Sequence, residues 1–198
     1  MASGVQLAPW CVPPMGWWHC ARQASEVWID GRVPKSKSLP LNRTVVLGPN
    51  GPHFLSIPLV GGRNSGWPAE ALQIDYRTAW QRQWLGALRS AYGKAPYFGL
   101  FFPEFSDILA QSPPHFLDLS NDIRSWMQRR FFLTDLRFSG TPDAECSDET
   151  RQDWEVVEVP FSIPETAFSS RMVSGFLPGP WEWLFYKPEV WLEEGGFS

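Results

Sequence analysis

The side chains best suited to chemistry in this sequence are arginines rather than metal ligands or nucleophiles. Arg43 follows a loop and precedes an extended run, so its guanidinium could hold a sugar-linked phosphate or a carboxylate through two parallel N–H donors. The alternative is a structural ion pair with a loop carboxylate. Arg82 and Arg89 lie two turns apart on the polar face of a predicted helix, where they either line a cleft or solvate the helix. We expect these three arginines to bind the anionic part of a substrate.

A turn with two tyrosines supplies the candidates for catalysis. Tyr92, Lys94 and Tyr97 surround Pro96 just after the end of the same predicted helix, and loops on a rigid scaffold commonly carry functional groups. We expect Tyr92 or Tyr97 to orient an acceptor and Lys94 to contact substrate. A packed turn is the alternative.

Metal and nucleophile motifs do not stand out. His19, His53 and His115 lie far apart without ligand-spaced neighbours. The acidic run at 143–149 lacks the ordered calcium loop, and Ser56 lacks a G-x-S-x-G context. The sequence therefore predicts no metal and no cofactor.

Tryptophan is unusually frequent, with twelve residues in the chain. Aromatic faces accept the apolar C–H surface of sugars, although large aromatic side chains also dominate protein cores. Trp17 is our candidate for substrate contact among a group near the two termini, which comprises Trp10, Trp17, Trp18, Trp181, Trp183 and Trp191.

The first half of the sequence predicts mainly extended elements. Val5–Pro9, a helix over His19–Ala24 and Glu26–Asp30 indicate a β-turn-helix-β unit, which places ligands at the carboxyl end of its first strand. The residues 31–41 indicate an exposed loop. Arg43–Leu47 and His53–Leu59 flank Asn50-Gly51 and predict an antiparallel hairpin, with a further extended run over Ala71–Ile74. Both kinds of strand pairing together predict a mixed sheet.

The second half predicts mainly helices. Thr78-x-x-Gln81 has the capping-box pattern and begins a helix that Gly93 ends. Two more helices are predicted over Pro103–Ala110, with the proline in the first turn, and Phe116–Phe131. An acidic loop at 139–154, an edge strand at 155–159 and short turns over 176–191 complete the chain.

Length and composition limit the class of protein. With 198 residues, 43% of them hydrophobic, the chain fits one domain over residues 1–198, of the α/β class (mixed α+β) with a mixed sheet flanked by helices. A net charge of −4 without a basic stripe argues against nucleic acid, and no apolar run approaches the roughly 20 residues that span a membrane. Three cysteines without a C-x-x-C pair suit a reducing compartment. We expect a cytoplasmic protein.

A family resemblance is carried by residues 41–59, Leu-Asn-Arg-Thr-Val-Val-Leu-Gly-Pro-Asn-Gly-Pro-His-Phe-Leu-Ser-Ile-Pro-Leu. It continues through Ile74-Asp75, Trp80-Gln81 and the Ala-Tyr-Gly-Lys-Ala-Pro-Tyr-Phe run at 91–98, with Pro-Met-Gly-Trp-Trp at 14–18 as the opening motif. These landmarks resemble the WbqC-like family. The chain departs from the pattern at Trp84, where the family often has a histidine, and in its ending, where Glu182 could occupy the acidic position.

The resemblance implies a cytoplasmic role in the biosynthesis of surface polysaccharides such as the O-antigen of lipopolysaccharide. It suggests a transferase that moves a glycyl, aminoacyl or acyl group to a sugar or nucleotide sugar, with Tyr92, Tyr97 and Glu182 as the catalytic candidates. A non-catalytic carbohydrate-binding or assembly module is the rival, motivated by the tryptophans and by Trp84. A deep hollow that brings Arg43 close to the Tyr92–Tyr97 turn would favour the enzyme.

Overall fold

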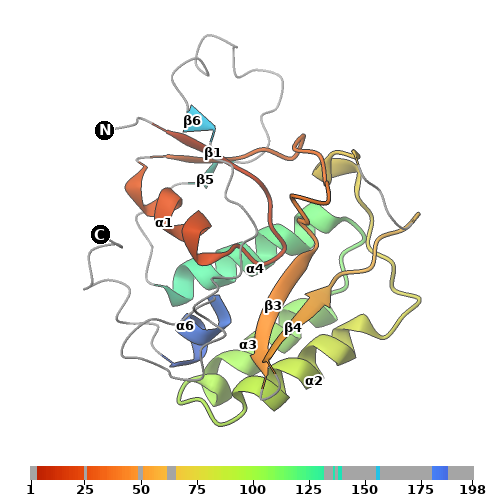
Figure 1. Ribbon diagram of the computed structural model, residues 1–198, viewed down its shortest axis with the longest axis vertical. Helices are drawn as coiled ribbons and strands as arrows, with labels where there is room; N and C mark the ends of the chain where they lie inside the picture. Colours follow the sequence, from red (N-terminus) through yellow and green to blue (C-terminus); the bar gives the residue numbers. More distant parts are fainter. Residues whose placement is uncertain are drawn as a thin grey trace.

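Helices and two small sheets make up the part of the protein that the structure describes (Figure 1). The computed structural model describes residues 4–24, 26–48, 51–61, 66–131, 136, 138–139, 155–156 and 180–186. Within them the predicted mixed α/β class is confirmed. No helix in these ranges is both long and apolar enough to cross a bilayer.

A parallel sheet forms from strands that are distant in sequence. Strands β1 (Val5–Leu7) and β2 (Val27–Ile29) are joined by helix α1 (Met15–Gln23), as the β-turn-helix-β prediction requires. Strands β5 (Phe138–Ser139) and β6 (Glu155–Val156) extend the sheet in the order β5-β2-β1-β6. The edge position of β6 is confirmed. Helix α1 begins earlier than predicted, directly after Pro14, whose fixed φ suits a helix start.

The antiparallel hairpin is a separate sheet. Strand β3 (Arg43–Gly48) pairs with β4 (Gly51–Ser56) in the register Arg43↔Ser56 to Gly48↔Gly51, and Gly51 has a φ of 101° that suits glycine. Parallel and antiparallel pairing thus occur in two sheets instead of one mixed sheet. The third predicted extended run is wrong in part, because Ala69–Ala71 forms a 3-10 helix, η1. The chain then makes only isolated bridges, Leu59↔Ile74 and Gln73↔His115.

Three helices, α2 (Trp80–Tyr92), α3 (Phe98–Ala110) and α4 (Phe116–Arg130), follow in succession, and α4 agrees with its prediction. The predicted capping box at the start of α2 is wrong. Its N-cap is Ala79 without a side-chain bond, because Gln81 instead donates to the Leu109 carbonyl and to Ser112 Oγ. Helix α3 starts ahead of Pro103, so this proline lies inside the helix.

Gly93 ends α2, as predicted, but for a steric reason. Its φ of −58° is an ordinary helical value, so conformational freedom is not required. A Cβ at this position would lie 2.5 Å from the carbonyl oxygen of Arg89. The close approach of the chain to the end of α2 therefore needs a residue without a side chain.

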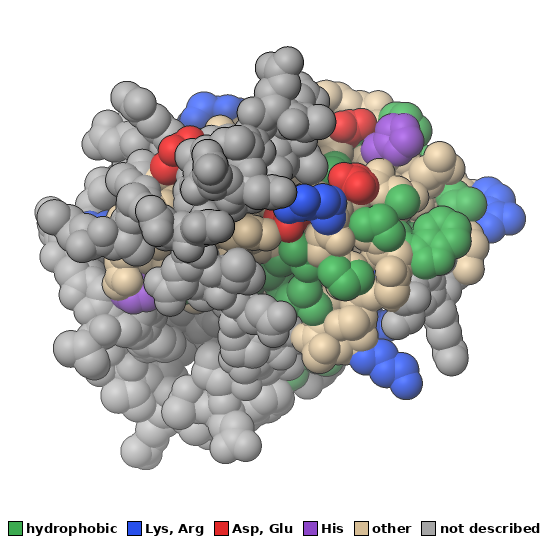
Figure 2. Space-filling model, turned by 90° about the horizontal axis from the view of Figure 1, so that it is seen from above, with side chains coloured by type: hydrophobic (Ala, Val, Ile, Leu, Met, Phe, Trp, Pro, Cys, Tyr) green, Lys and Arg blue, Asp and Glu red, His purple; other side chains and the backbone are tan. Residues whose placement is uncertain are grey.

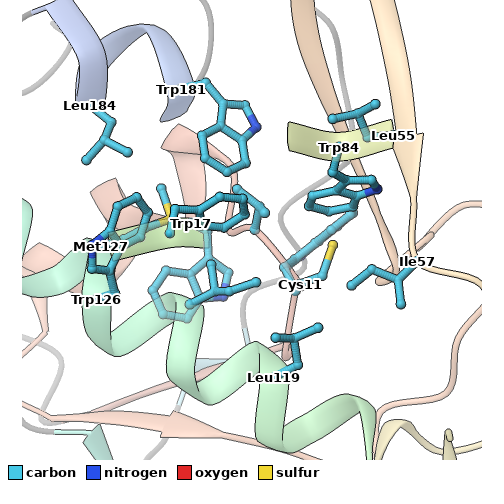
Figure 3. Close-up of a cluster of buried hydrophobic side chains, with 14 of the residues drawn as sticks. Cys11, Trp17, Leu55, Ile57, Trp84, Leu119, Trp126, Met127, Trp181 and Leu184 are labelled. Carbon is cyan, nitrogen blue, oxygen red and sulfur yellow. The ribbon is translucent and has the colours of Figure 1, made fainter. Parts of the chain in front are cut away.

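Indole rings are the largest side chains of the core, which also contains many phenylalanine, leucine, isoleucine and valine residues (Figure 3). Helix α6 (Pro180–Tyr186), where short turns were predicted, adds Trp181 and Phe185 to it, and the rest of the 176–191 segment lies outside the described residues. The predicted acidic loop at 139–154, apart from Ser139, and residues 157–159 of the predicted edge strand also lie outside the described residues. The fully buried tryptophans among the described residues are Trp10, Trp17, Trp18, Trp80, Trp84, Trp126 and Trp181.

Candidate functional site

A hollow lined by three cationic side chains lies beside the first residue of β3. Its volume is about 720 Å³, and its basic residues are Lys35 and Lys37 from the loop before the hairpin and Arg43 from the strand. None of its described lining residues is acidic; the others are Ser36, Pro40, Asn42, Ser56, Ile57, Pro58 and Leu59. Such a hollow is electropositive and suits an anion.

Asn42 anchors the strand at the floor of this hollow. The side chain is buried, and its Nδ2 donates to the carbonyl of Ile57 across the hairpin at 2.7 Å. The backbone N–H of Ile57 returns a bond to the carbonyl of Asn42 at 2.8 Å. The amide oxygen of Asn42, by contrast, has no hydrogen-bond partner among the described residues. These two bonds thus hold this wall of the hollow rigidly, and the unpartnered oxygen is itself buried.

Burial and a neighbouring positive charge act on Lys35 in the hollow. The pKa of Lys35 is lowered from its ordinary value, first by partial burial of the ammonium and second by the charge of Arg43. Among the described residues no carboxylate forms an ion pair with Arg43. The alternative role of this arginine, a structural ion pair with a loop carboxylate, is therefore absent from this part of the chain. A bound anion would relieve the repulsion and raise the Lys35 pKa again.

A second hollow, of about 600 Å³, lies between α2 and α3. Arg82 and Arg89 line it together with Gln81, Ser106 and Ser112, which corresponds to the cleft alternative for these two arginines. The guanidinium of Arg89 lies over the ring of Phe102, 5.2 Å from its centroid. The two hollows share no described lining residue, so the expected convergence of Arg43 with the α2 arginines on one site does not occur.

The geometry of α2 explains this separation. Helical spacing puts Trp84 and Tyr92 on one face, and this face meets the hairpin: the Trp84 indole N–H donates to the Ser56 carbonyl, and the Leu47 N–H donates to the Tyr92 hydroxyl. Arg82 lies about 200° around the helix from Trp84, on the face toward α3. Arg43 and Leu47 are about 13 Å apart along β3, so Arg43 also stays far from the Tyr92 turn.

The tyrosine turn is packed more than it is open. Tyr92 is buried, with its ring 5.5 Å from that of Phe185. Tyr97 is half-buried and stacks on Phe101, with ring centroids 5.8 Å apart. Lys94 is exposed but lines neither hollow. These residues therefore form a packed turn, which was the alternative to a functional site.

Two more candidates lie elsewhere. Trp17 is buried, donates its indole N–H to the Ala8 carbonyl at 2.9 Å and stacks on Phe138, so neither of its faces is open to a sugar ring. Glu182 belongs to α6, and its side chain lies outside the described part of the protein.

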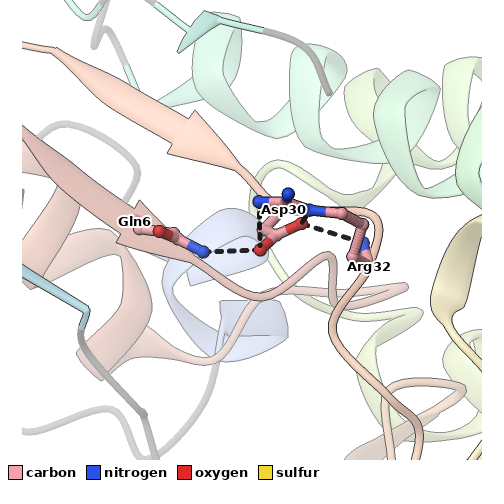
Figure 4. Close-up of polar contacts among 3 residues, drawn as sticks. All are labelled: Gln6, Asp30 and Arg32. Atoms are coloured by element: carbon pink, nitrogen blue, oxygen red, sulfur yellow. Dashed lines mark hydrogen bonds and ion pairs between the residues drawn. The ribbon is translucent and has the colours of Figure 1, made fainter. Parts of the chain in front are cut away.

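A polar cluster that no sequence pattern predicted lies at the carboxyl end of the parallel strands (Figure 4). Asp30 follows β2 and is only 6% exposed. Its carboxylate accepts from Gln6 Nε2 on β1 at 2.5 Å and from the backbone N–H and guanidinium of Arg32. A signal was present, because a lone aspartate ends the apolar run Val27–Ile29. Since Gln6 and Arg32 already engage this carboxylate, we regard the cluster as a support for the strand ends.

The signal in the sequence for the cationic hollow is weaker. Lys35 and Lys37 fall in the predicted exposed loop over 31–41, yet they precede Arg43 closely enough to share a site once the loop folds back. The spacing Lys35-Ser36-Lys37 is the one feature of the sequence that indicates two lysines directed to the same side of an extended loop. Among the described residues no three side chains of the metal-ligating types come together.

Fold and site together define a mixed α/β protein with an electropositive hollow at the start of a β-hairpin. The model of the WbqC-like protein family matches residues 8–159, so the chain belongs to the WbqC-like protein family. A comparison with curated proteins gave no match.

Proposed function

We propose that the protein binds the phosphate groups of a small-molecule substrate, such as a nucleotide sugar, in the hollow formed by Lys35, Lys37 and Arg43. The observation that carries this proposal is the gathering of three cations without a carboxylate among the described lining residues. Arginine donates two parallel N–H groups to a phosphate, and lysine acts as a point charge.

The activity that this site supports is a cytoplasmic transferase of surface-polysaccharide biosynthesis, which moves a glycyl, aminoacyl or acyl group to a sugar or nucleotide sugar. Its support is membership of the WbqC-like family together with a site built for positioning and for charge stabilisation. Arg43 and Lys35 would hold the phosphate-bearing substrate. The hollow of Arg82 and Arg89 lies on the other side of α2, so it would bind a carboxylate such as glycine apart from this site and would not present it for the transfer.

The hollow of Arg43 does not include the Tyr92–Tyr97 turn, so the criterion for the enzyme is not met, and the transferase keeps only the family and the cationic hollow as its support. The rival function is a non-catalytic carbohydrate-binding or assembly module. It depended on tryptophans that stack on sugars, whereas the four of that group whose side chains are described lie in the core: Trp10, Trp17, Trp18 and Trp181.

The test is isothermal titration calorimetry with inorganic pyrophosphate, a nucleoside diphosphate and glycine. Arg43→Ala is expected to weaken pyrophosphate binding by about 10-fold or more, because a charge-assisted contact contributes about 1.5–3 kcal/mol. Arg129→Ala is the matched control, since it removes an exposed positive charge near the end of α4 and lines neither hollow.

Arg82→Ala separates the two hollows. It should leave pyrophosphate affinity within about twofold and weaken glycine binding, since Arg82 lines only the hollow between α2 and α3. Equal affinity for pyrophosphate in the wild-type protein and Arg43→Ala would remove the β3 hollow from the proposal.

A further inference from the structure

One tryptophan departs from the burial of the rest. Trp67 is 53% exposed, although it is among the largest hydrophobic side chains of the chain. It lies just before η1, in a segment that runs alongside the loop carrying the lysines. Hydrophobic and basic side chains occur close together on the upper face of the molecule (Figure 2). An open indole next to a cationic hollow is a combination that core packing does not require.

Backbone bonds fix Trp67 opposite Lys35. Pro34 and Pro68 form an antiparallel bridge, Lys35 N–H donates to the Trp67 carbonyl at 2.9 Å, and Gly66 N–H donates to the Lys35 carbonyl at 2.8 Å. Gly66 has a φ of 86°. These bonds and this angle are those of a G1 β-bulge, in which Gly66 and Trp67 together oppose Lys35.

The bulge determines where the indole lies. Side chains directly opposite each other in an antiparallel pair have Cβ atoms about 4.5–5.5 Å apart on the same face of the ribbon. The Trp67 side chain therefore leaves the backbone on the same face as Lys35, which lines the hollow, although Trp67 itself is not among the lining residues. Bulges often occur where a side chain must be aimed at a functional site.

We propose that Trp67 is a stacking platform for the nucleobase of a nucleoside diphosphate whose phosphates lie in the hollow of Lys35 and Arg43. The assignment rests on the proposed function and gives it a substrate class. The phosphates would meet Lys35 and Arg43, while the base would cover the exposed indole face. Stacking tolerates different bases, so Trp67 adds affinity for nucleotides without selecting one base.

The experiment compares ligands that share phosphates but differ in the ring. Uridine diphosphate, adenosine diphosphate, glucose 1-phosphate and inorganic pyrophosphate are titrated by calorimetry into the wild-type protein, Trp67→Ala and Trp67→Phe. Trp67→Ala is expected to weaken both nucleotides on the order of 10- to 100-fold and to leave pyrophosphate within about twofold. Trp67→Phe should restore much of the nucleotide affinity.

Phe54→Ala is the control, because Phe54 is also an exposed aromatic residue, 49% exposed on β4, and lines neither hollow. It should bind all four ligands as the wild type does. A far-ultraviolet spectrum and a melting temperature for each variant verify that Trp67→Ala keeps the fold, which we expect because the indole is half in solvent.

The possible failures are distinct. If pyrophosphate binds and is lost in Arg43→Ala while Trp67→Ala leaves the nucleotides unchanged, the stacking platform is refuted and the phosphate site stands. An equal loss of nucleotides and pyrophosphate in Trp67→Ala would also overturn stacking, because the indole would then shape the hollow itself. A loss for glucose 1-phosphate as large as for the nucleotides would reassign the ring to a sugar. If neither pyrophosphate nor nucleotides bind the wild type, the proposed function fails.

Discussion

Glu104 is expected to be the polar residue on which the packing of α3 against α4 depends most. Its carboxylate accepts the indole N–H of Trp126 at 2.7 Å and two guanidinium bonds from Arg130 at 2.8 and 2.6 Å. Trp126 is buried, whereas Arg130 is only half-buried. Glu104→Ala would therefore remove the acceptor of a buried donor and one partner of an ion pair that solvent partly screens.

The two losses differ in size. A buried donor left without its partner costs about 1–3 kcal/mol, and a partly exposed ion pair contributes about 0–1 kcal/mol. Glu104→Ala should thus lower the free energy of unfolding by about 1–4 kcal/mol. For a chain of this length the melting temperature should fall by about 2–16 °C, at about 2–4 °C per kcal/mol. Glu104→Gln keeps an acceptor for Trp126 and should lose about 1 kcal/mol or less.

Thermal and urea unfolding, each followed by circular dichroism and tryptophan fluorescence, measure these changes. Asp107→Ala is the matched control, because it removes an exposed carboxylate from the same helix. The reasoning is refuted if Glu104→Ala melts within about 2 °C of Asp107→Ala, or if Glu104→Gln loses as much stability as the alanine variant.

Three further predictions concern single groups. Tyr92→Phe should lose about 0.5–1.5 kcal/mol of stability, because its hydroxyl accepts a β3 backbone N–H, and should bind pyrophosphate as the wild type does; a large loss of affinity by calorimetry would instead place the hydroxyl at the ligand. Gly93→Ala should destabilise by about 1–3 kcal/mol in urea unfolding through the clash at the end of α2, whereas Gly86→Ala, which has open space, should stabilise by about 0.5–1 kcal/mol; the same sign in both variants would contradict this account. Pyrophosphate affinity should fall as pH rises toward 10.5, because Lys35, with its pKa lowered below that value, loses its charge; calorimetry on Lys35→Arg should show a flatter profile, and an equal slope in both proteins would exclude Lys35.

The lowered pKa of Lys35 also makes the free energy of unfolding depend on pH. Between the folded and the unfolded pKa the unfolded chain binds more protons, so the contribution of Lys35 to the free energy of unfolding rises with pH across that window. Below the folded pKa the charged ammonium carries the full unfavourable effect of burial and of Arg43.

Local signals in the sequence predicted the elements well where burial and period agree. Helix α4 shows this, because Ile123 and Met127 repeat at helical spacing and are buried. The prediction failed where distant contacts decide. Gln81 matches a capping pattern, yet partners after α3 claim its amide, and α3 continues through Pro103 because its buried phenylalanines lie on both sides of that residue.

The site shows the same division. Arg43 was found from its type and its place before a strand, and it does line a cationic hollow. The periodicity of α2 separated its polar from its apolar face, but it could not tell that the hairpin covers the face of Trp84 while Arg82 turns toward α3. The sequence patterns do not predict a role for Trp67, because the direction of its side chain depends on a bulge formed with a loop that is distant in the sequence.

The parallel sheet can be completed only late in synthesis on the ribosome, because its strands are far apart in the sequence. Val5 pairs with Glu155, so the strand made first must wait for one of its neighbours, which at about 5–20 residues per second takes roughly 7–30 s. The hairpin and α2, whose contacts are closer in sequence, can assemble in that interval. During translation the amino-terminal strand therefore has one side open to unwanted strand pairing, for which a chaperone that shields nascent β-edges would be the natural remedy.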